Sequence, residues 1–599
     1  MNAKYIIPSD MKLKFNVQYL KKPAFYVLSS FFIASVLSLT LMKKPGGLPP
    51  SDPDNGGLAF PDGFEAVVVV DSLGPARHLA VNNNGDIYVK LRFSEKGGNV
   101  AMRDTDNDGK ADIIQHFGNY KDVGSLANGM RIHKGYLYYS SSLAIYRSKL
   151  TPGKLVPDSP METVLTDDHG HGAHWHITKP VSFDDKGFMY VPFGTPSNNC
   201  MDMANTPGGK PGQPGITPCP ELVQHGGIWR FDANKIGLTQ KDGTLFATGL
   251  RSIVAMDWNK ADKSLYVVQH GRDNLHRLFP ELYTPWESAV LPSEEFLKIK
   301  EGDDAGWPYY YYDQIQKKKL MTPEYGGDGK KEGKGRELAQ PLIGFPGHWA
   351  PNDLYFYQGN QFPARYKNGA FIAFHGSTNR APYPQAGYFV AFVPFKNGVP
   401  SGDWEVFADG FAGVDPIVNV RDAKLRPMGI AEGPDGSLYI SETEKGRIWR
   451  VMFKGDKKTF GNAQLLAMEK HKQLSHIRTP DKIKDDLEKG KIKPEAALYN
   501  TYCSACHQND GKGDGNRFPP LGGTDWVTGD KTRLLNVVLK GLNGEIVVND
   551  KPYNGLMPAH NFLKDEEVAN ILTYIRSNFG NSSSAVSLQE VIEFRKSNM

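Results

Sequence analysis

A tight turn followed by a short alternating strand recurs six times between residues 82 and 442. In each copy Gly, Asn or Asp supplies the turn, and the residues that follow alternate as in a half-buried strand. The six copies are NNNGDIYVKL (82–91), HKGYLYYSS (133–141), DDKGFMYVPF (184–193), KADKSLYVVQ (260–269), YKNGAFIAFH (366–375) and GPDGSLYISE (433–442). They predict a mainly β chain folded as a six-bladed β-propeller, with a generic β-sandwich as the alternative. Their uneven spacing predicts long loops, where a site is usually built.

Length and charge narrow the possible functions. A chain of 599 residues is too long for one ordinary core, so two or more folded units are expected. The net charge of +4 is small for this length and gives no reason to expect a nucleic-acid partner.

The N-terminal region carries an uncharged apolar run, AFYVLSSFFIASVLSLTLM, over residues 24–42. A spanning helix needs about 20 such residues. More lysines precede the run than follow it, which predicts a cytoplasmic segment (1–22), a membrane-spanning helix (23–42), a Pro/Gly-rich linker (43–57) and an exported remainder. We therefore expect a periplasmic or other extracytoplasmic protein anchored in the inner membrane. A cleaved signal peptide is the alternative, although no A-x-A site follows the run.

The segment DTDNDGKAD (104–112) has the pattern of a calcium loop. Asp104, Asp106 and Asp108 alternate, Gly109 allows a sharp bend, and Asp112 adds a further carboxylate. Position twelve is Gln115, so the pattern predicts a single calcium loop between strands, against an ordinary Asp/Asn turn.

Two of the four cysteines, Cys200 and Cys219, flank a flexible Pro/Gly-rich segment. In an oxidising compartment a disulfide that closes this loop is the expected arrangement, and two free thiols are the alternative.

After residue 455 the strand pattern gives way to charged segments with helical spacing. This predicts a charged helical linker (456–483), a small all-α domain (484–580) and a C-terminal tail (581–599). Within the domain, Cys503 and Cys506 offer thiols for thioether bonds to haem, and His507 offers an axial iron ligand. Met557 in YNGLMPAH is the expected opposite ligand, with His560 as its rival.

The C-x-x-C-H motif alone also fits a redox dithiol or half of a zinc site. Together with the downstream Met-Pro and the amphipathic segment KDEEVANILTYIRSNF, it resembles a class I c-type cytochrome. That resemblance implies covalently bound haem c.

Five ordered blocks within residues 60–453 carry a second resemblance. They are HITKPVSFDDKGFMYVPFGTPSN (176–198), GLRSIVAMDWNKADKSLYVVQHGRDNL (249–275), EFLKIKEGDDAGWPYYYYD (295–313), GAFIAFHGSTNR (369–380) and RPMGIAEGPDGSLYISE (426–442). They resemble PQQ-dependent sugar dehydrogenases of the soluble glucose and sorbosone dehydrogenase type. The resemblance implies a propeller domain, here residues 58–455, with pyrroloquinoline quinone (PQQ) above its central axis.

The chemistry of such an enzyme requires a base for the hydroxyl proton while the C–H hydride moves to the quinone. Histidine suits this role, and the resemblance places the base at His176. His174 remains the alternative within the histidine-rich segment DDHGHGAHWHI (167–177), which could also form a zinc cluster.

PQQ carries carboxylates and gains negative charge on reduction, so guanidinium groups are expected around it. The resemblance implies a catalytic role for Arg251 beside His176. It implies PQQ contacts for Arg77, Lys179, His375, Arg380 and Arg426. Two residues depart from the family: Ser252 stands where soluble glucose dehydrogenases carry Asn, and Lys179 where the sorbosone type often has Arg.

Together these features predict a quinoprotein dehydrogenase that oxidises a sugar, alcohol or aldehyde with PQQ and calcium. Electrons would pass to the fused haem c and then to a soluble cytochrome or a respiratory-chain component. Two alternatives stay open: an inactive propeller that binds carbohydrate and carries a haem relay, and a calcium-dependent, lactonase-like hydrolase.

Overall fold

The computed structural model describes residues 47–92, 98–120, 128–169, 176–201, 210–333, 337–380, 383–417, 420–479, 494–515 and 517–598. The predicted membrane-spanning segment lies outside these residues, as does the start of the predicted linker that follows it. Within the described part of the chain, no helix combines the length and apolar character needed to cross a bilayer.

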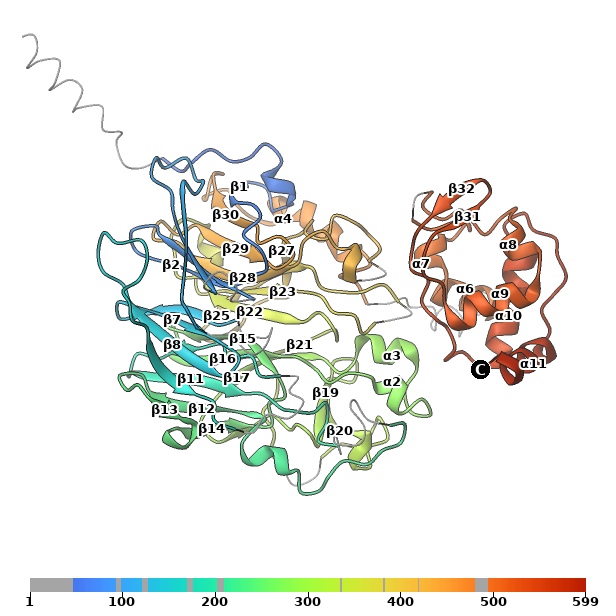
Figure 1. Ribbon diagram of the computed structural model, residues 1–599, viewed down its shortest axis with the longest axis horizontal. Helices are drawn as coiled ribbons and strands as arrows, with labels where there is room; N and C mark the ends of the chain where they lie inside the picture. Colours follow the sequence, from blue (N-terminus) through green and yellow to red (C-terminus); the bar gives the residue numbers. More distant parts are fainter. Residues whose placement is uncertain are drawn as a thin grey trace, which may run out of the picture. The chain divides into compact units, whose positions relative to one another are not determined.

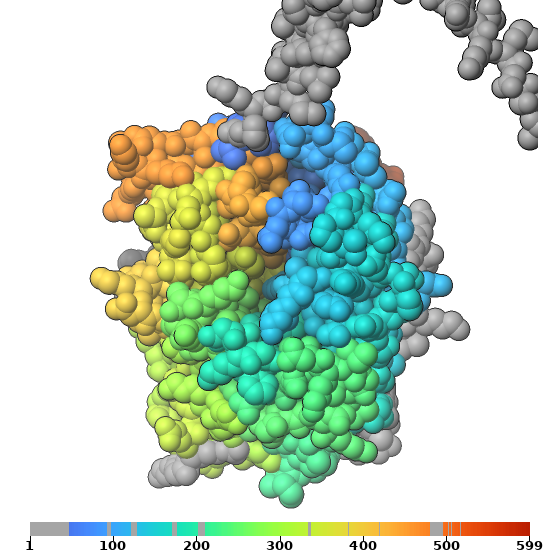
Figure 2. All heavy atoms as spheres, turned by 90° about the vertical axis from the view of Figure 1, so that its left-hand side faces the viewer, coloured from blue at the N-terminus to red at the C-terminus, as the bar shows by residue number. Residues whose placement is uncertain are grey.

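Residues 64–453 belong to the larger unit of the chain. Its strands form six sheets of four or five strands, which confirms the predicted six-bladed propeller. Figure 2 shows one face of this unit, on which the sequence colours run in order around a centre. The first three sheets are β2 (Ala76–Val81), β3 (Ile87–Leu91), β4 (Asn99–Arg103), β5 (Ile113–Phe117); β6 (Met130–His133), β7 (Tyr136–Ser140), β8 (Ala144–Lys149), β9 (Glu162–Thr166) with β13 (Leu238–Thr239); and β10 (Ser182–Phe183), β11 (Phe188–Phe193), β12 (Gly227–Asp232), β14 (Thr244–Thr248), β18 (Asp303–Asp304).

The other three sheets complete the ring. They are β15 (Ile253–Asn259), β16 (Ser264–Gln269), β17 (Glu294–Ile299), β21 (Ile343–Phe345); β22 (Pro351–Phe356), β23 (Ala370–Phe374), β24 (Phe389–Val393), β27 (Glu405–Ala408); and β28 (Pro427–Glu432), β29 (Leu438–Glu442), β30 (Ile448–Phe453) with β1 (Phe64–Val70). Because β1 pairs with β30, the start of the domain closes the last blade. Closing the ring in this way leaves no long exposed edge.

Each predicted turn–strand unit ends in the second strand of a blade, namely β3, β7, β11, β16, β23 and β29. The turns need left-handed backbone: Gly85 and Gly187 have φ of 91° and 96°. Glycine adopts such angles without strain, which explains why these turns can be recognised in the sequence.

The innermost strands β2, β6, β10, β15, β22 and β28 lie next to one another around the axis of the ring, here called the central channel. The Thr178 hydroxyl, just before β10, donates to the carbonyl of Ile253 at the start of β15 over 2.9 Å. The His78 amide at the start of β2 donates to the carbonyl of Asn128, just before β6, over 3.2 Å. The loops that lead into the inner strands therefore meet at one mouth of the channel.

Loops that connect the strands carry most of the remaining elements of the larger unit. One such loop holds the predicted disulfide between Cys200 and Cys219, which is confirmed, with Cα atoms 6.0 Å apart. The elements in these loops are α2 (Leu275–Leu278), α3 (Pro285–Val290), β19 (Tyr310–Asp313), β20 (Lys318–Met321), β25 (Phe395–Lys396), β26 (Val399–Pro400) and the 3-10 helices η2 (Pro220–Val223), η3 (Gln240–Asp242), η4 (Pro323–Tyr325), η5 (Ala364–Tyr366) and η6 (Val420–Asp422), whereas the 3-10 helix η1 (Asn55–Gly57) precedes β1.

The start of the predicted charged linker folds back onto the propeller. Helix α4 (Asn462–Glu469) and the 3-10 helix η7 (Lys470–Gln473) follow the last blade. Met468 and Ile477 are buried in the same apolar cluster as Phe374 and Val406 of the fifth blade. The linker is therefore part of the propeller surface at least as far as Ile477.

The second unit, red in Figure 1, is helical. It contains α6 (Pro494–Tyr502), α7 (Ser504–His507), α8 (Asp525–Thr528), α9 (Lys531–Lys540), α10 (Asp565–Ser577), α11 (Leu588–Asn598) and the hairpin β31 (Ile546–Val548) with β32 (Lys551–Tyr553). Asp530 caps α9 by accepting from the amides of Thr532 and Arg533 at 2.9 and 3.3 Å. Helix α11 occupies much of the predicted tail (581–599) and buries Val591 and Phe594 in the core of this unit, because these two side chains lie one turn apart on one face.

Candidate functional site

Four of the predicted site residues lie at the mouth of the channel because of their places on or next to the strands. Arg77 is the second residue of β2, and Arg251 and Arg426 come just before β15 and β28. His375 directly follows β23, the strand paired with the inner strand β22.

His375 and Arg426 form a hydrogen-bonded pair. The Arg426 guanidinium donates to His375 Nδ1 at 2.8 Å and to the carbonyls of His375 and Gly376 at 3.1 and 2.7 Å. Because arginine only donates, Nδ1 accepts, and the ring proton sits on Nε2, 3.1 Å from the Thr443 hydroxyl. Burial, with the charge of Arg426 second, holds the pKa of His375 well below its usual value, so this imidazole is neutral.

Arg77 adds a second buried cation to this group. Its side chain is 6% exposed, and its Nε has no hydrogen-bond partner among the described residues. Burial, followed by repulsion from Arg92 and Arg426, lowers the pKa of Arg77 to about 9. Arg77 therefore adds a positive charge at the mouth, and no described residue neutralises it.

Arg251 is held by several partners. Its guanidinium donates to the Asn198 carbonyl and side-chain oxygen at 3.1 and 2.9 Å, to the Gly271 carbonyl at 2.7 Å and to the Asp273 carboxylate at 2.9 Å. Asp273 also accepts from the Asn379 amide at 2.7 Å. This arrangement fixes a cation and a carboxylate side by side at the mouth.

His176 lies within electrostatic reach of Arg251 and Asp273. Its Nδ1 lies 2.8 Å from the Thr195 carbonyl, which can only accept, so Nδ1 carries the proton and Nε2 is left with its lone pair. Burial first, and then the charge of Arg251, keeps the pKa of His176 well below 6.5. The imidazole is therefore neutral and can accept a proton at Nε2.

Two predicted cations have other surroundings. Lys179 is buried in an ion pair with Asp167, with 2.5 Å between the charged atoms, and its ammonium lies 4.8 Å from the centre of the Phe193 ring. Arg380 is 1% exposed, and its Nε and Nη1 have no hydrogen-bond partner among the described residues. Burial, with repulsion from Arg478 second, lowers the pKa of Arg380 to about 9.

The histidine-rich segment is described only in part. His171 and His174 lie outside the described residues, whereas His169 Nδ1 is 3.1 Å from the Asp167 carboxylate. Among the described residues, one group of at least three acidic, histidine or cysteine side chains is close enough together to hold a metal ion. That group does not include His169.

That group is the predicted calcium loop, which connects β4 to β5. One carboxylate oxygen from each of Asp104, Asp106 and Asp108 lies within 4.8 Å of the others. Asp112 lies outside this group, because its carboxylate accepts from the amide and the hydroxyl of Thr105, each at 2.6 Å.

Sequence reasoning missed Asp273, Asn198 and Thr195. Asp273 and Asn198 lie at the ends of blocks that carry the resemblance, but neither position has a motif of its own. Their roles depend on contacts between residues 53 and 75 positions apart, which no local pattern encodes.

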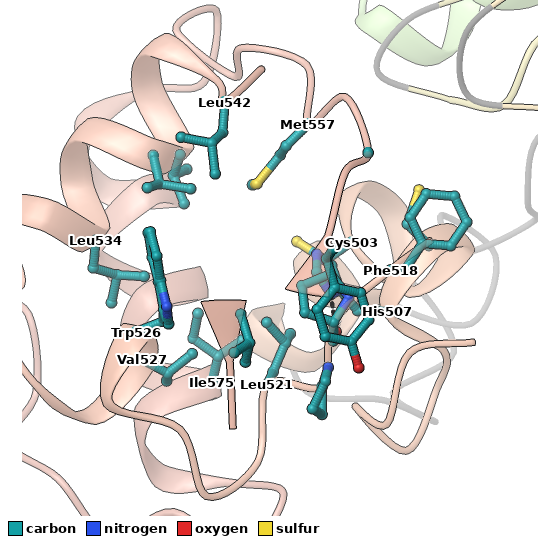
Figure 3. A pocket seen from close by; sticks show the side chains of 18 of the residues that line it. Cys503, His507, Phe518, Leu521, Trp526, Val527, Leu534, Leu542, Met557 and Ile575 are labelled. Atoms are coloured by element: carbon teal, nitrogen blue, oxygen red, sulfur yellow. Dashed lines mark hydrogen bonds between the residues drawn. The ribbon is translucent and has the colours of Figure 1, made fainter. Parts of the chain in front are cut away.

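The helical unit contains a cavity that is partly open to solvent. Apolar side chains line most of it, including Phe518, Leu521, Val527, Leu534 and Ile575. In Figure 3 the side chain of Met557 points into this cavity from the top of the view, and Cys503 and His507 lie at its right. Cys506 and His560 also line it.

Local contacts orient the two predicted iron ligands. His507 Nδ1 lies 2.9 Å from the Pro519 carbonyl, so it carries the proton and leaves Nε2 as the available ligand atom. The backbone of Met557 pairs with Leu542 through two hydrogen bonds of 2.8 and 2.9 Å. Each ligand is therefore fixed by the backbone of a different loop.

Two protein families match the chain. The TrAA12-like family matches residues 58–454, and the Cytochrome c family matches residues 495–579. A relative supports the second match. Cytochrome c-552 of Thermus thermophilus is 39% identical to this chain over 92 residues, which are 15% of this chain and 70% of that protein. A Borreliella burgdorferi protein described as uncharacterized is 27% identical over 220 residues, so the match covers 36% of this chain but about half, 51%, of that relative.

Solved structures share the propeller fold. The Trichoderma reesei Carbohydrate-Active Enzymes Family AA12 protein is 18% identical with a TM-score of 0.52, and the match covers 66% of this chain and 98% of that one. The PQQ domain of Coprinopsis cinerea pyranose dehydrogenase is 17% identical with a TM-score of 0.50, covering 68% and 99%. With the family match extending over most of the propeller, the chain belongs to the TrAA12-like family and carries a cytochrome c domain after its propeller.

Proposed function

We propose that this protein is a quinoprotein dehydrogenase that oxidises a CH–OH group of a sugar or related alcohol or aldehyde and passes the electrons to its own haem c. The observation that supports this most directly is the mouth of the channel. There a neutral histidine, His176, which carries its ring proton on Nδ1, lies within electrostatic reach of a fixed arginine, Arg251, beside a group of buried cations.

The residues at the mouth suit PQQ, which carries carboxylates. Arg77 Nε and Arg380 Nε and Nη1 are buried donors without partners among the described residues. Leaving such a donor unsatisfied costs about 1–3 kcal/mol, so a bound anion would stabilise the site. Arg77 and the His375–Arg426 pair at the mouth would hold the cofactor, with Arg380 as a further proposed contact, and the cofactor supplies the hydride acceptor when bound.

The protein's own contribution is proton transfer and charge stabilisation. His176 Nε2 would take the hydroxyl proton of the substrate, while the Thr195 carbonyl holds the ring in the required tautomer. Arg251 would stabilise negative charge that develops beside the base, because Asn198 and Asp273 fix its position before the reaction. The Lys179 ammonium would act through its ion pair with Asp167 and not as a free cation.

The helical unit suits haem c. Its cavity is mostly apolar, two cysteines that form no disulfide line it, and His507 at the end of α7 and Met557 also line it. Cys503 and Cys506 would form the thioether bonds to haem, and His507 and Met557 would bind its iron. Methionine–histidine ligation raises the haem potential and suits a one-electron acceptor.

We also propose that the β4–β5 loop binds calcium through Asp104, Asp106 and Asp108. The expected result is that calcium raises the melting temperature of the wild type and has a smaller effect on Asp106→Asn. Equal calcium shifts in both proteins, measured by calorimetry after chelator treatment, would exclude this loop as the site.

The proposed compartment is the periplasm or another extracytoplasmic space, with an anchor in the inner membrane. The Cys200–Cys219 disulfide supports export, because disulfides persist in oxidising compartments. Protease protection of the N-terminal residues in intact cells would test the anchor.

The central test records the haem spectrum of the haem-loaded protein in calcium while PQQ and then a panel of aldoses, aldehydes and simple alcohols are added. Haem reduction that needs both PQQ and one substrate class is the expected result. Pyranoses come first in the panel, since the Coprinopsis cinerea relative is a pyranose dehydrogenase. Absence of both haem reduction and PQQ binding would favour a carbohydrate-binding propeller, and ester hydrolysis without haem reduction would favour a hydrolase.

A further inference from the structure

A six-residue segment, Thr195–Cys200 (TPSNNC), connects the candidate base to the candidate arginine; we call it the strap. It follows β11 at the mouth of the channel and ends at the disulfide. The side chains of Thr195, Ser197, Asn198, Asn199 and Cys200 are fully buried. The strap is thus part of the protein interior, although it is an irregular loop.

The first residue of the strap contacts both functional side chains. The Thr195 carbonyl accepts from His176 Nδ1 at 2.8 Å, and its hydroxyl lies 3.2 Å from the same nitrogen. The Thr195 amide donates to the Arg251 carbonyl over 3.0 Å. One residue therefore sets the tautomer of His176 and fixes the backbone of Arg251.

The fourth residue holds the guanidinium. Arg251 donates to the carbonyl and to the side-chain oxygen of Asn198. The same side-chain oxygen accepts from the Asp273 amide at 2.9 Å, and the Asn198 amide group donates to the Asp273 carbonyl at 2.9 Å. Asn198 is thus bonded both to the cation and to the residue that supplies its counter-ion.

Three contacts fix the strap itself. Cys200 is bonded to Cys219, and the Cys200 amide donates to the Ser197 hydroxyl at 2.7 Å. The Trp307 indole packs against the disulfide and donates to the Asn198 carbonyl at 3.1 Å. The distal end of the strap is therefore held by a covalent bond.

We propose that the disulfide-anchored strap positions the base and the arginine of the dehydrogenase site, with Thr195 and Asn198 as positioning residues. The inference rests on the proposed function for its catalytic meaning. Neither residue reacts: Thr195 orients the proton-accepting nitrogen of His176, and Asn198 keeps the Arg251 cation beside it. An oxidised Cys200–Cys219 pair is then a requirement for full activity and not only for stability.

The test compares Asn198→Ala with Asn199→Ala in the full chain loaded with haem, PQQ and calcium. Asn199 is a matched control, because it is the neighbouring amide, is equally buried and has no side-chain hydrogen bond among the described residues. Asn198→Ala is expected to lower kcat by about 10²-fold, since a displacement of about 1 Å at a site costs that much. Asn199→Ala, which breaks no hydrogen bond to Arg251 or Asp273, is expected to lower kcat much less than Asn198→Ala.

A second readout does not depend on turnover. Histidine modification by diethyl pyrocarbonate, followed by peptide mapping, gives the titration midpoint of His176 in the apoprotein. Because Arg251 contributes to keeping the pKa of His176 low, release of the guanidinium in Asn198→Ala should move this midpoint upward. The midpoint in Asn199→Ala should match the wild type. A Cys200→Ser/Cys219→Ser variant should move it in the same direction as Asn198→Ala.

The possible outcomes test the role of the strap and the proposed function independently of each other. A shifted His176 midpoint in Asn198→Ala but not in Asn199→Ala supports the strap, whether or not any substrate is oxidised. Equal midpoints in all variants, or equal losses of kcat in both asparagine variants, overturn it. Lack of PQQ-dependent haem reduction in the wild type overturns the proposed function and leaves the titration result to decide the role of the strap.

Discussion

At the mouth of the channel, burial determines the protonation state of two histidines. His176 and His375 are both kept neutral by desolvation and by neighbouring arginines, and in each ring one nitrogen is assigned by a fixed partner. The two rings differ in which nitrogen carries the proton, Nε2 in His375 and Nδ1 in His176. The lone pair of His375 on Nδ1 is already used by Arg426, whereas the lone pair of His176 is on Nε2. That difference supports the proposal of His176, and not His375, as the base.

Replacing His176 by Gln should reduce PQQ-dependent turnover by about 10²–10⁴-fold, the usual contribution of a general base. In the wild type, the base works in its neutral form, so activity should be retained as pH falls until the lowered pKa of His176 is reached. The acidic limb of the kcat/KM profile should therefore lie below pH 6.5. His116→Gln, on the exposed strand β5, serves as the control. An acidic limb at or above pH 6.5 would contradict the assignment.

Gly194 precedes the strap and touches the backbone of His176. A Cβ atom at this position would lie 1.9 Å from the His176 carbonyl oxygen, far inside contact distance. Gly194→Ala should therefore displace His176 and lower kcat at least tenfold while the haem spectrum stays unchanged. Gly461→Ala is a suitable control, because its added Cβ meets nothing within 4 Å. Wild-type kcat in Gly194→Ala would show that the position of His176 is not critical.

The blades were predictable because each hairpin is encoded locally. Gly85, Gly187 and Gly436 mark turns whose positive φ favours glycine, and a period-two strand follows each of them. The haem cavity was predictable for the same reason, since Cys503, Cys506 and His507 are contiguous. By contrast, the Arg251–Asp273 pair and its tie to Asn198 join separate insertions, so only the folded chain reveals them. Helix α11 was missed because its segment begins with a polar, serine-rich run.

The segment after the last blade is held to the propeller by a buried charged histidine. His476 lies between two carboxylates, with Nε2 at 3.1 Å from Asp409 and Nδ1 at 3.2 Å from Asp415. His471 Nδ1 contacts the other oxygen of Asp409 at 2.6 Å. Despite burial, these partners raise the pKa of His476 to about 9.

The attachment of residues 461–479 should therefore depend on pH. The raised pKa contributes roughly 3 kcal/mol, fully present below about pH 6.5, the ordinary pKa, and lost as pH rises through about 9. Protection of this segment from hydrogen exchange, relative to the intrinsic rate at the same pH, should fall between pH 7 and 10, and His476→Gln should be weakly protected throughout. His471→Gln should have a smaller effect, because His471 is 28% exposed and has one carboxylate partner. Protection that is independent of both pH and His476 would contradict this account.

The whole chain joins a site for two-electron chemistry to a pocket for a one-electron carrier. Docking of His476 fixes where the connection to the helical unit leaves the propeller, and the helical unit begins at Pro494. A covalent connection of 14 residues (480–493) gives the second unit an effective concentration of about millimolar. Intramolecular electron transfer should then be independent of protein concentration.

Cleavage of the connection provides the decisive measurement. A protease site is introduced within residues 480–493, and the protein is loaded with haem and PQQ before it is cut. Before cleavage, the rate of haem reduction should be the same at all protein concentrations. After cleavage, the rate should become proportional to concentration and fall by about 10³-fold at 1 μM, the ratio of millimolar to micromolar. Reduction of a small dye should continue at the original rate, because the propeller site is untouched. If the cut fragments separate on a sizing column and haem reduction is still independent of concentration, the haem does not depend on the covalent connection to reach its electron donor.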